Sequence, residues 1–191
     1  MRNLFLFILF ILLSGCEQKL PSPFHANDVS MPLSGANFNL NDNNGKLRTL
    51  ADFKGKVVAL FFGYTHCPDV CPTTLADLAQ VMEMLGKDAD KVQVLFITVD
   101  PERDEPKMLA KYMSVFHPSF MALHGDSAAT AQAAKAFYVN YQKQPTSFGY
   151  SMDHSVGIFL IDPKGRVRLR AQNNQRPAWL LEDIRLLLAG V

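Results

Sequence analysis

The chain has 191 residues, of which 48% are hydrophobic, and this length and composition suit one domain with a sizeable core. Its 19 basic residues nearly balance its 18 acidic residues, and neither kind is gathered into a block. Such a charge pattern argues against nucleic acid or another polyanion as the partner.

The first residues have the pattern of an export signal. Arg2 precedes an apolar run from Leu4 to Leu13, which is too short to remain as a transmembrane helix. Leu13-Ser14-Gly15-Cys16 follows and resembles the bacterial lipobox, whose cysteine is lipidated after cleavage. We therefore expect residues 1–15 to be a lipoprotein signal peptide and Cys16 to carry the lipid. An ordinary signal peptide and an uncleaved anchor are the alternatives.

Export would place the domain in the cell envelope, facing the periplasm or the cell exterior and held to the membrane by lipid. Residues 16–34 are polar and proline-containing and predict a tether, so we expect the folded domain to span residues 35–191. Asn43-Asn44-Gly45 lies between short alternating runs and predicts a β-hairpin. The apolar run Val57–Phe62 then predicts a buried strand.

Two cysteines, Cys67 and Cys71, lie where this strand is expected to turn into a helix. Across one helical turn their Cα atoms would be roughly 6 Å apart, which permits a disulfide or the binding of one metal ion by both sulfurs. The helix N-terminus would also favour the thiolate form. A structural disulfide, redox exchange and soft-metal binding all remain open. Because exported thiols tend to oxidise, a functional pair would need a reductant or a metal.

The remaining elements alternate in type along the chain. We expect a helix over residues 75–85, a strand over 92–99, a helix capped by Asp104, a short strand over 120–123 and a helix over 127–137. Residues 139–155 are expected to form a long loop, followed by a hairpin over 157–170 and a helix over 179–188. This order predicts an α/β sandwich with a mixed sheet, as in a thioredoxin-like domain.

A metal held by two thiolates needs a further donor. Two cysteines suit Cu(I), zinc or an iron–sulfur cluster, and His154 is the favoured third ligand because it precedes a strand expected beside the first one. Asp69, Asp100 and Asp153 could border the site. Their alternative roles are helix capping and turn hydrogen bonds, and Asp153 could orient His154.

Three motifs in this order resemble the Sco/SenC family. They are Gly-Tyr-Thr-His-Cys-Pro-Asp-Val-Cys-Pro at 63–72, Thr-Val-Asp-Pro-Glu-Arg-Asp at 98–104, and Asp-His-Ser at 153–155 with Phe-Leu-Ile-Asp-Pro-Lys-Gly at 159–165. The likeness runs from about Phe38 to Leu188. It implies a thioredoxin-like, membrane-tethered copper metallochaperone that helps to assemble the copper A centre of cytochrome c oxidase.

The same resemblance implies the ligands and partners. Cys67, Cys71 and His154 would bind copper as Cu(I) and Cu(II), the acceptor would be the copper A subunit, and a thiol reductant would keep the pair reduced. The chain departs from the family in its anchor, because a lipobox replaces the common transmembrane helix. This departure leaves open which membrane and which oxidase the protein serves.

Three other functions compete with copper delivery. A thiol-disulfide oxidoreductase could act on cysteines of the oxidase subunit or of another exported protein. However, thioredoxins have two residues between their cysteines, not three, and a cis-proline where this chain has Met152-Asp153-His154-Ser155. A peroxidase would need an arginine beside its thiolate, and the motif has none nearby. A structural envelope lipoprotein would use the cysteine pair as a disulfide only.

Overall fold

The computed structural model describes residues 22–147 and 149–191. The expected signal peptide, Cys16 and the first part of the expected tether lie outside these residues. In the described part of the chain, no helix is both long enough and apolar enough to cross a membrane.

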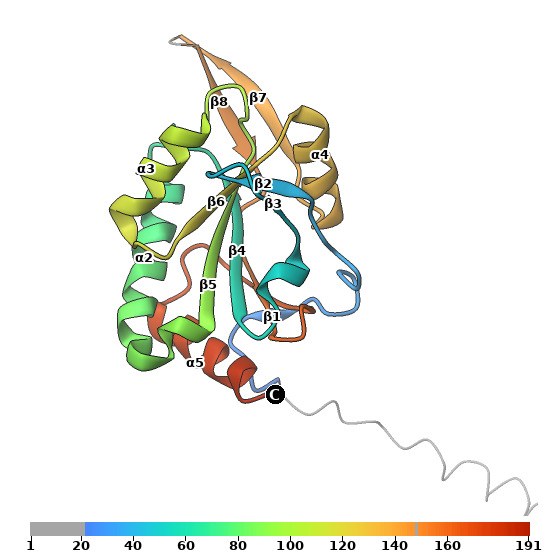
Figure 1. The fold of residues 1–191 in the computed structure, drawn as a ribbon, viewed down its shortest axis with the longest axis vertical. Helices are drawn as coiled ribbons and strands as arrows, with labels where there is room; N and C mark the ends of the chain where they lie inside the picture. The colour runs from blue at the N-terminus through green and yellow to red at the C-terminus, as the bar shows by residue number, and fades with distance from the viewer. Residues whose placement is uncertain (1–21, 148) are drawn as a thin grey trace, which may run out of the picture.

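An eight-stranded mixed sheet forms the middle of the molecule (Figure 1). Its spatial order is β1-β10-β9-β4-β5-β6-β2-β3. The strands span Asn27–Asp28 (β1), Leu40–Asp42 (β2), Leu47–Arg48 (β3), Val57–Gly63 (β4), Val92–Thr98 (β5), Met121–His124 (β6), Ile158–Ile161 (β9) and Val167–Ala171 (β10). The predicted hairpin at Gly45 is present, since β2 and β3 pair antiparallel around it.

The central strand β4 has partners on both sides. It runs parallel to β5 in an unbroken register from Val57↔Val92 to Gly63↔Thr98, and β9 pairs with it antiparallel. All seven residues of β4 are buried. A strand buried on both faces reads as a continuous apolar run, which is why the sequence predicted it well.

Helices cover both faces of the sheet (Figure 1). One core joins β4, β5 and β9 to α2 (Val70–Leu85), α3 (Pro106–Phe116) and α5 (Pro177–Leu188). The opposite core joins the sheet to α4 (Ser127–Ala136) and the short 3₁₀ helix η1 (Leu50–Phe53). A second 3₁₀ helix, η2 (Gly86–Lys91), connects α2 to β5. The predicted α/β sandwich with a mixed sheet and an N-terminal hairpin is confirmed.

The expected long loop over residues 139–155 was wrong. Residues Tyr141–Thr146 (β7) and Gly149–His154 (β8) pair in register as a separate two-stranded sheet that stands at the top of Figure 1. Most of its side chains are at least partly exposed, so the strands lack the apolar alternation that marks a half-buried strand. Pro145 is tolerated because β7 is an edge strand.

The last part of the expected tether is packed on the domain. The buried carboxylate of Asp183 in α5 accepts the backbone N–H groups of His25 at 2.8 Å and of Ala26 at 2.9 Å. β1 then pairs with β10, and Leu33 is buried. The ordered domain therefore includes residues that the sequence pattern assigned to the tether.

Candidate metal centre

The two cysteines lie at the carboxyl end of β4, in the turn into α2. Gly63 ends the strand, and a Cβ atom built on it would lie 2.7 Å from the Cys71 Sγ and 2.7 Å from Cε2 of Phe96. Real Cβ contacts are longer, so glycine at this position lets the Cys71 sulfur pack directly against the strand end. Cys71 is buried within the first turn of α2, whereas Cys67 is partly exposed.

No disulfide joins the two thiols, and their pKa values are shifted in opposite directions. The Cys71 thiol donates a hydrogen bond to the Cys67 sulfur, which lowers the pKa of Cys67 to about 5 although partial burial opposes the shift. Backbone N–H groups of Asp69 and Cys71 and the nearby His154 lower this pKa further. The same hydrogen bond, together with burial, raises the pKa of Cys71. The pair is thus an accessible thiolate beside a buried, protonated thiol.

His154 ends β8, and its ring contacts the ring of Tyr64, which lies three residues before Cys67. The two rings lie edge to face with centroids 6.0 Å apart, and Tyr64 is hydrogen-bonded to the backbone of Met152 in β8. The Nδ1 atom of His154 is 3.0 Å from the backbone oxygen of Ser155. This contact suits a proton on Nδ1 and leaves the Nε2 lone pair free to bind a metal.

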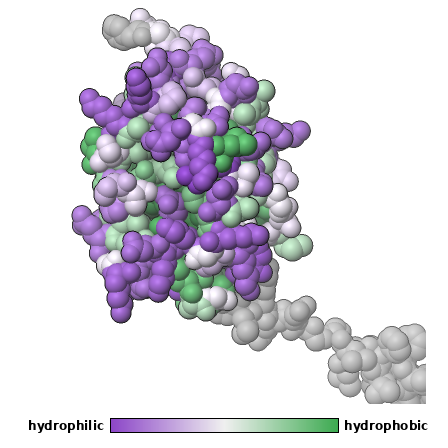
Figure 2. Space-filling model, viewed as in Figure 1, coloured by the Kyte–Doolittle hydropathy of each residue, from purple (hydrophilic) through white to green (hydrophobic). Residues whose placement is uncertain are grey.

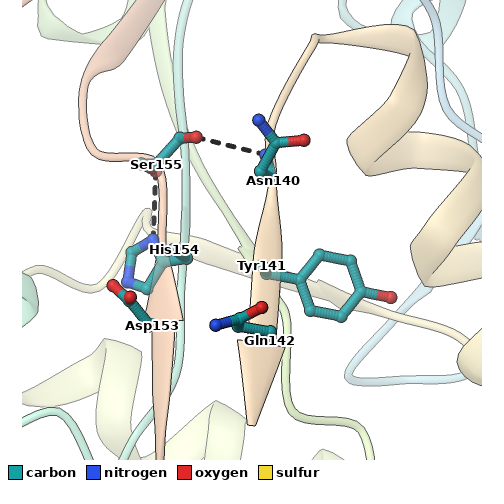
Figure 3. A pocket seen from close by; sticks show the side chains of 6 residues that line it. All are labelled: Asn140, Tyr141, Gln142, Asp153, His154 and Ser155. Carbon is teal, nitrogen blue, oxygen red and sulfur yellow. Dashed lines mark hydrogen bonds between the residues drawn. The ribbon is translucent and has the colours of Figure 1, made fainter. Parts of the chain in front are cut away.

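An open pocket of about 320 Å³ lies beside His154. It is lined by residues at the base of the hairpin, namely Asn140, Tyr141, Gln142, Asp153, His154 and Ser155 (Figure 3). The Ser155 hydroxyl accepts the backbone N–H of Asn140 at 3.1 Å and so helps to close the hairpin base. The imidazole is therefore approachable from solvent.

The structure brings the two cysteines together and places His154 in their electrostatic range. Within the described residues, however, no group of three or more histidine, cysteine, aspartate or glutamate side chains is arranged to hold a metal ion. A three-ligand site needs the His154 ring to approach the thiols. The donor set itself, two sulfurs and one imidazole nitrogen, fits copper in either oxidation state.

The three acidic residues proposed to border the site differ in their contacts. Asp69 occupies the N-cap position of α2, without a capping hydrogen bond from its side chain. Asp100 is buried in the turn after β5, where its carboxylate binds Arg103 and the Tyr150 hydroxyl. Asp153 is exposed beside His154, while the His154 Nδ1 contacts the Ser155 backbone oxygen. A role for Asp153 in orienting the imidazole stays a prediction.

Asp104 was expected to cap α3, and this expectation was wrong. The N-cap residue of α3 is Glu105. The Asp104 carboxylate is buried and accepts hydrogen bonds from the hydroxyl groups of Thr65 and Thr98, both at 2.6 Å. The sequence signal for this role was available: several polar residues directly follow a buried strand, at the sheet edge that also carries the cysteines.

Of the other histidines, none joins the pair in the structure. His66 is 46% exposed, and its Nδ1 lies 3.1 Å from the Thr65 hydroxyl and 3.8 Å from the Asp104 carboxylate. His25 stacks on Trp179, and His117 contacts Ser119 at the end of α3. His124 ends β6. These placements agree with the choice of His154 as the distant candidate ligand.

The fold and the free cysteine pair define the class as a thioredoxin-like thiol protein. A family model described as SCO1/SenC matches residues 27–189, and the chain therefore belongs to the SCO1/SenC family.

Relatives and solved structures agree with this assignment. The chain is 42% identical over 132 residues to the human mitochondrial protein SCO2 homolog, matching 67% of this chain and 50% of the human protein. It thus spans about half the length of that relative. A SCO2-like protein of Rickettsia felis is 32% identical over 154 residues, covering 79% of this chain and 75% of the relative.

The copper-bound structure of Bradyrhizobium japonicum ScoI superposes with a TM-score of 0.74 at 43% identity, and covers 80% of this chain and 98% of that one. Apo Sco1 from Thermus thermophilus superposes with a TM-score of 0.76 at 37% identity, covering 86% and 97%.

Proposed function

We propose that this protein is a copper metallochaperone that binds copper through Cys67, Cys71 and His154. The observation that carries the proposal is the free pair of Cys67 and Cys71, with a pKa of about 5 for Cys67, and the edge-to-face contact of His154 with Tyr64 in the cysteine loop. Thiolate and imidazole are preferred donors for copper. The copper-bound structure of a relative with 43% identity supports the same cargo.

Copper uptake would couple to proton release and to a movement of the hairpin. Cys67 is a thiolate at neutral pH, whereas Cys71 must lose its proton when its sulfur binds the ion. His154 must then approach the sulfurs as the third ligand. Because Cys67 and His154 are both partly exposed, an acceptor thiolate could replace the chaperone's ligands one at a time.

The test is an anaerobic Cu(I) titration against a competing chelator, with His154→Ala, Cys71→Ser and the matched control His117→Ala. We expect Cys71→Ser to lose affinity by more than about 100-fold, His154→Ala to lose about 10-fold or more, and the control to match the native protein. Full affinity in either ligand variant would overturn the proposed ligand set.

We also propose that the copper acceptor is the copper A subunit of a cytochrome c oxidase. An acceptor whose own site is built from thiolates and imidazoles would match the donor chemistry of this chaperone and exchange ligands readily. The test is copper transfer from the loaded protein to a purified, copper-free copper A domain. If copper passes to glutathione but not to this domain, the proposed acceptor is wrong. An exported thiol reductant would have to keep Cys67 and Cys71 from forming a disulfide.

The chain is further proposed to be a lipoprotein of the cell envelope, anchored at Cys16 with the domain facing the periplasm or cell exterior. The sequence pattern of residues 1–16 supports this. Metabolic labelling with palmitate should mark the native protein and not Cys16→Ala. Equal labelling of both would contradict the lipid site.

Thiol-disulfide exchange is a second candidate, favoured by the asymmetry of the pair. The Cys67 thiolate would attack a substrate disulfide and release one substrate thiolate. Cys71, once deprotonated, would then attack the mixed disulfide and release the second, leaving a Cys67–Cys71 disulfide. Metal-free insulin reduction driven by a thiol reductant tests this function, and His154→Ala should leave it intact if exchange is the activity.

A further inference from the structure

The loop between β5 and α3 carries two buried carboxylates, which contact different halves of the candidate metal centre. Asp104 faces the cysteine half. Besides the hydroxyl groups of Thr65 and Thr98, its carboxylate accepts the Thr65 backbone N–H at 3.1 Å. Thr65 is two residues before Cys67, so Asp104 binds the start of the cysteine loop through both its backbone and its side chain.

Asp100, at the other end of the loop, faces the histidine half. Its carboxylate accepts the Tyr150 hydroxyl at 2.8 Å and the Arg103 Nε. Arg103 in turn donates Nη1 to the Tyr150 backbone oxygen at 2.8 Å, and its guanidinium lies 3.7 Å from the centroid of the Tyr150 ring. Tyr150 is therefore held at its hydroxyl, its ring face and its backbone. It belongs to β8, the strand that ends at His154.

These contacts matter because the β7–β8 hairpin is not paired to the eight-stranded sheet. A strand inside a sheet is positioned by its ladder of backbone hydrogen bonds, whereas this hairpin is positioned by side chains. The ion pair between Lys143 of the hairpin and Glu102 of the loop joins two exposed groups and contributes little. The buried Asp100 contacts and the Tyr64 contacts with β8 are the stronger constraints.

We propose that the Asp100–Asp104 segment is a bracket that sets the position of His154 relative to the two thiols, with Tyr150 as the positioning residue on the hairpin. This proposal rests on the proposed copper-binding function. Charged side chains make the contacts at both ends of this segment. Asp104 binds the cysteine loop, and Asp100 together with Arg103 binds Tyr150.

The bracket controls which oxidation state of copper is bound more tightly. Two thiolates supply most of the binding of the soft Cu(I) ion, with the imidazole as a weaker third donor, whereas Cu(II) favours a higher coordination number with nitrogen and oxygen donors. A loosened hairpin therefore weakens Cu(II) binding more than Cu(I) binding. The bracket thereby shifts the balance between the two states without touching the metal.

The experiment compares Tyr150→Phe with Tyr141→Phe in the reduced protein. Both changes remove one hydroxyl from the same hairpin. The Tyr150 hydroxyl binds Asp100, whereas the Tyr141 hydroxyl makes no hydrogen bond within the described residues, and its ring points away from His154 in Figure 3. Three measurements are made on each variant: amide hydrogen exchange of the metal-free protein, affinities for Cu(I) and Cu(II), and the thiolate-to-Cu(II) charge-transfer and electron paramagnetic resonance spectra.

For Tyr150→Phe we expect the β7–β8 amides to exchange about 10-fold faster, since a hydrogen bond to a buried charge is lost. Cu(II) affinity should fall about 10-fold, as for a lost orienting contact, while Cu(I) affinity changes less than about 3-fold. The Cu(II) spectra should change as well. Arg103→Lys should act in the same direction, because lysine cannot reproduce the paired contacts. Tyr141→Phe should match the native protein throughout.

The bracket is overturned if Tyr150→Phe matches Tyr141→Phe in hydrogen exchange, or if it weakens Cu(I) and Cu(II) equally with unchanged Cu(II) spectra. If the native protein binds no copper, the proposed function fails separately. Hydrogen exchange in the metal-free variants would still support or overturn the mechanical part of the bracket.

Discussion

The cysteine half and the histidine half of the candidate metal centre are built in different ways. The cysteines follow β4, a fully buried strand with backbone partners on both sides, and Cys71 is packed against Gly63 and Phe96. His154 ends a strand of the two-stranded hairpin, in which Met152 is the buried residue of β8. The fold thus holds the sulfurs in place, whereas a few side chains hold the imidazole. A centre of this kind can keep one part rigid while the other part opens for loading and release.

The largest expected difference is in hydrogen exchange. Amides of β4 and β5 should exchange only through global unfolding, which costs about 5–15 kcal/mol in a typical domain. Amides of β7 and β8 should exchange through local opening and thus at least about 100-fold faster. Hydrogen exchange read by mass spectrometry at pH 7 measures both. Equal protection of the two regions would contradict the contrast between them.

The second prediction concerns the pH dependence of the Cys67 alkylation rate. Because the pKa of Cys67 is about 5, its alkylation rate should change less than about 2-fold between pH 6.5 and 8.5, whereas an ordinary thiol with a pKa of 8.5 becomes about 50-fold more ionised over this range. Since this pKa is lowered on folding, the thiolate stabilises the fold above the pKa of the unfolded thiol. That contribution is lost as the pH falls through about 5.

The pH dependence of Cys67 alkylation also distinguishes the effect of Cys71 on the Cys67 pKa from that of His154. The hydrogen bond from Cys71 is the largest cause that lowers the pKa of Cys67, and the electrostatic effect of His154 is smaller. Cys71→Ala should therefore move the Cys67 alkylation profile to higher pH much more than His154→Ala does. The rate of iodoacetamide modification, followed by mass spectrometry, measures this. A larger shift in His154→Ala would mean that the imidazole, not the partner thiol, governs Cys67.

The next prediction concerns the packing of the cysteine half. Gly63→Ala places a methyl group against the Cys71 sulfur and the fully buried Phe96 ring, and we expect a loss of about 1–3 kcal/mol in the free energy of unfolding. Urea denaturation of the reduced protein provides the measurement. Copper affinity should fall too, because the Cys71 sulfur is displaced. An unchanged urea midpoint would show that this end of β4 is more adaptable than its packing indicates.

The smallest effect is expected at the exposed edge of the hairpin. Lys143 pairs with Glu102, with 44% and 60% of the respective side chains exposed. Lys143→Gln should change the free energy of unfolding by less than about 0.5 kcal/mol and leave hairpin hydrogen exchange nearly unchanged. A large effect would mean that exposed pairs, and not the buried contacts of Tyr150, hold the hairpin.

The sequence predicted the parts of the fold that depend on apolar periodicity. The buried strand from Val57 and the amphipathic helices were found in this way, whereas the hairpin at Gly45 was found from its turn residues between alternating runs. It failed at residues 139–155, because a hairpin held by polar contacts leaves no apolar pattern. It also failed for Asp104, since a polar residue before a helix indicates a cap equally well whether or not a distant hydroxyl competes for it. Cys67 and Cys71 were chosen by their spacing and His154 by its place before a strand expected beside the first one. The resemblance to the Sco/SenC family implied all three as ligands, and this remains a prediction about metal binding.

The docking of the N-terminal segment on Asp183 has a mechanical consequence. Force applied to the chain ahead of residue 22 passes into α5 through the two backbone N–H groups that Asp183 holds, and into β10 through its pairing with β1. In Figure 1, α5 lies at the opposite end of the molecule from the β7–β8 hairpin that carries His154. A pull on the N-terminal segment would therefore enter the domain far from His154, and it would reach Cys71 through the packing of α5 on α2.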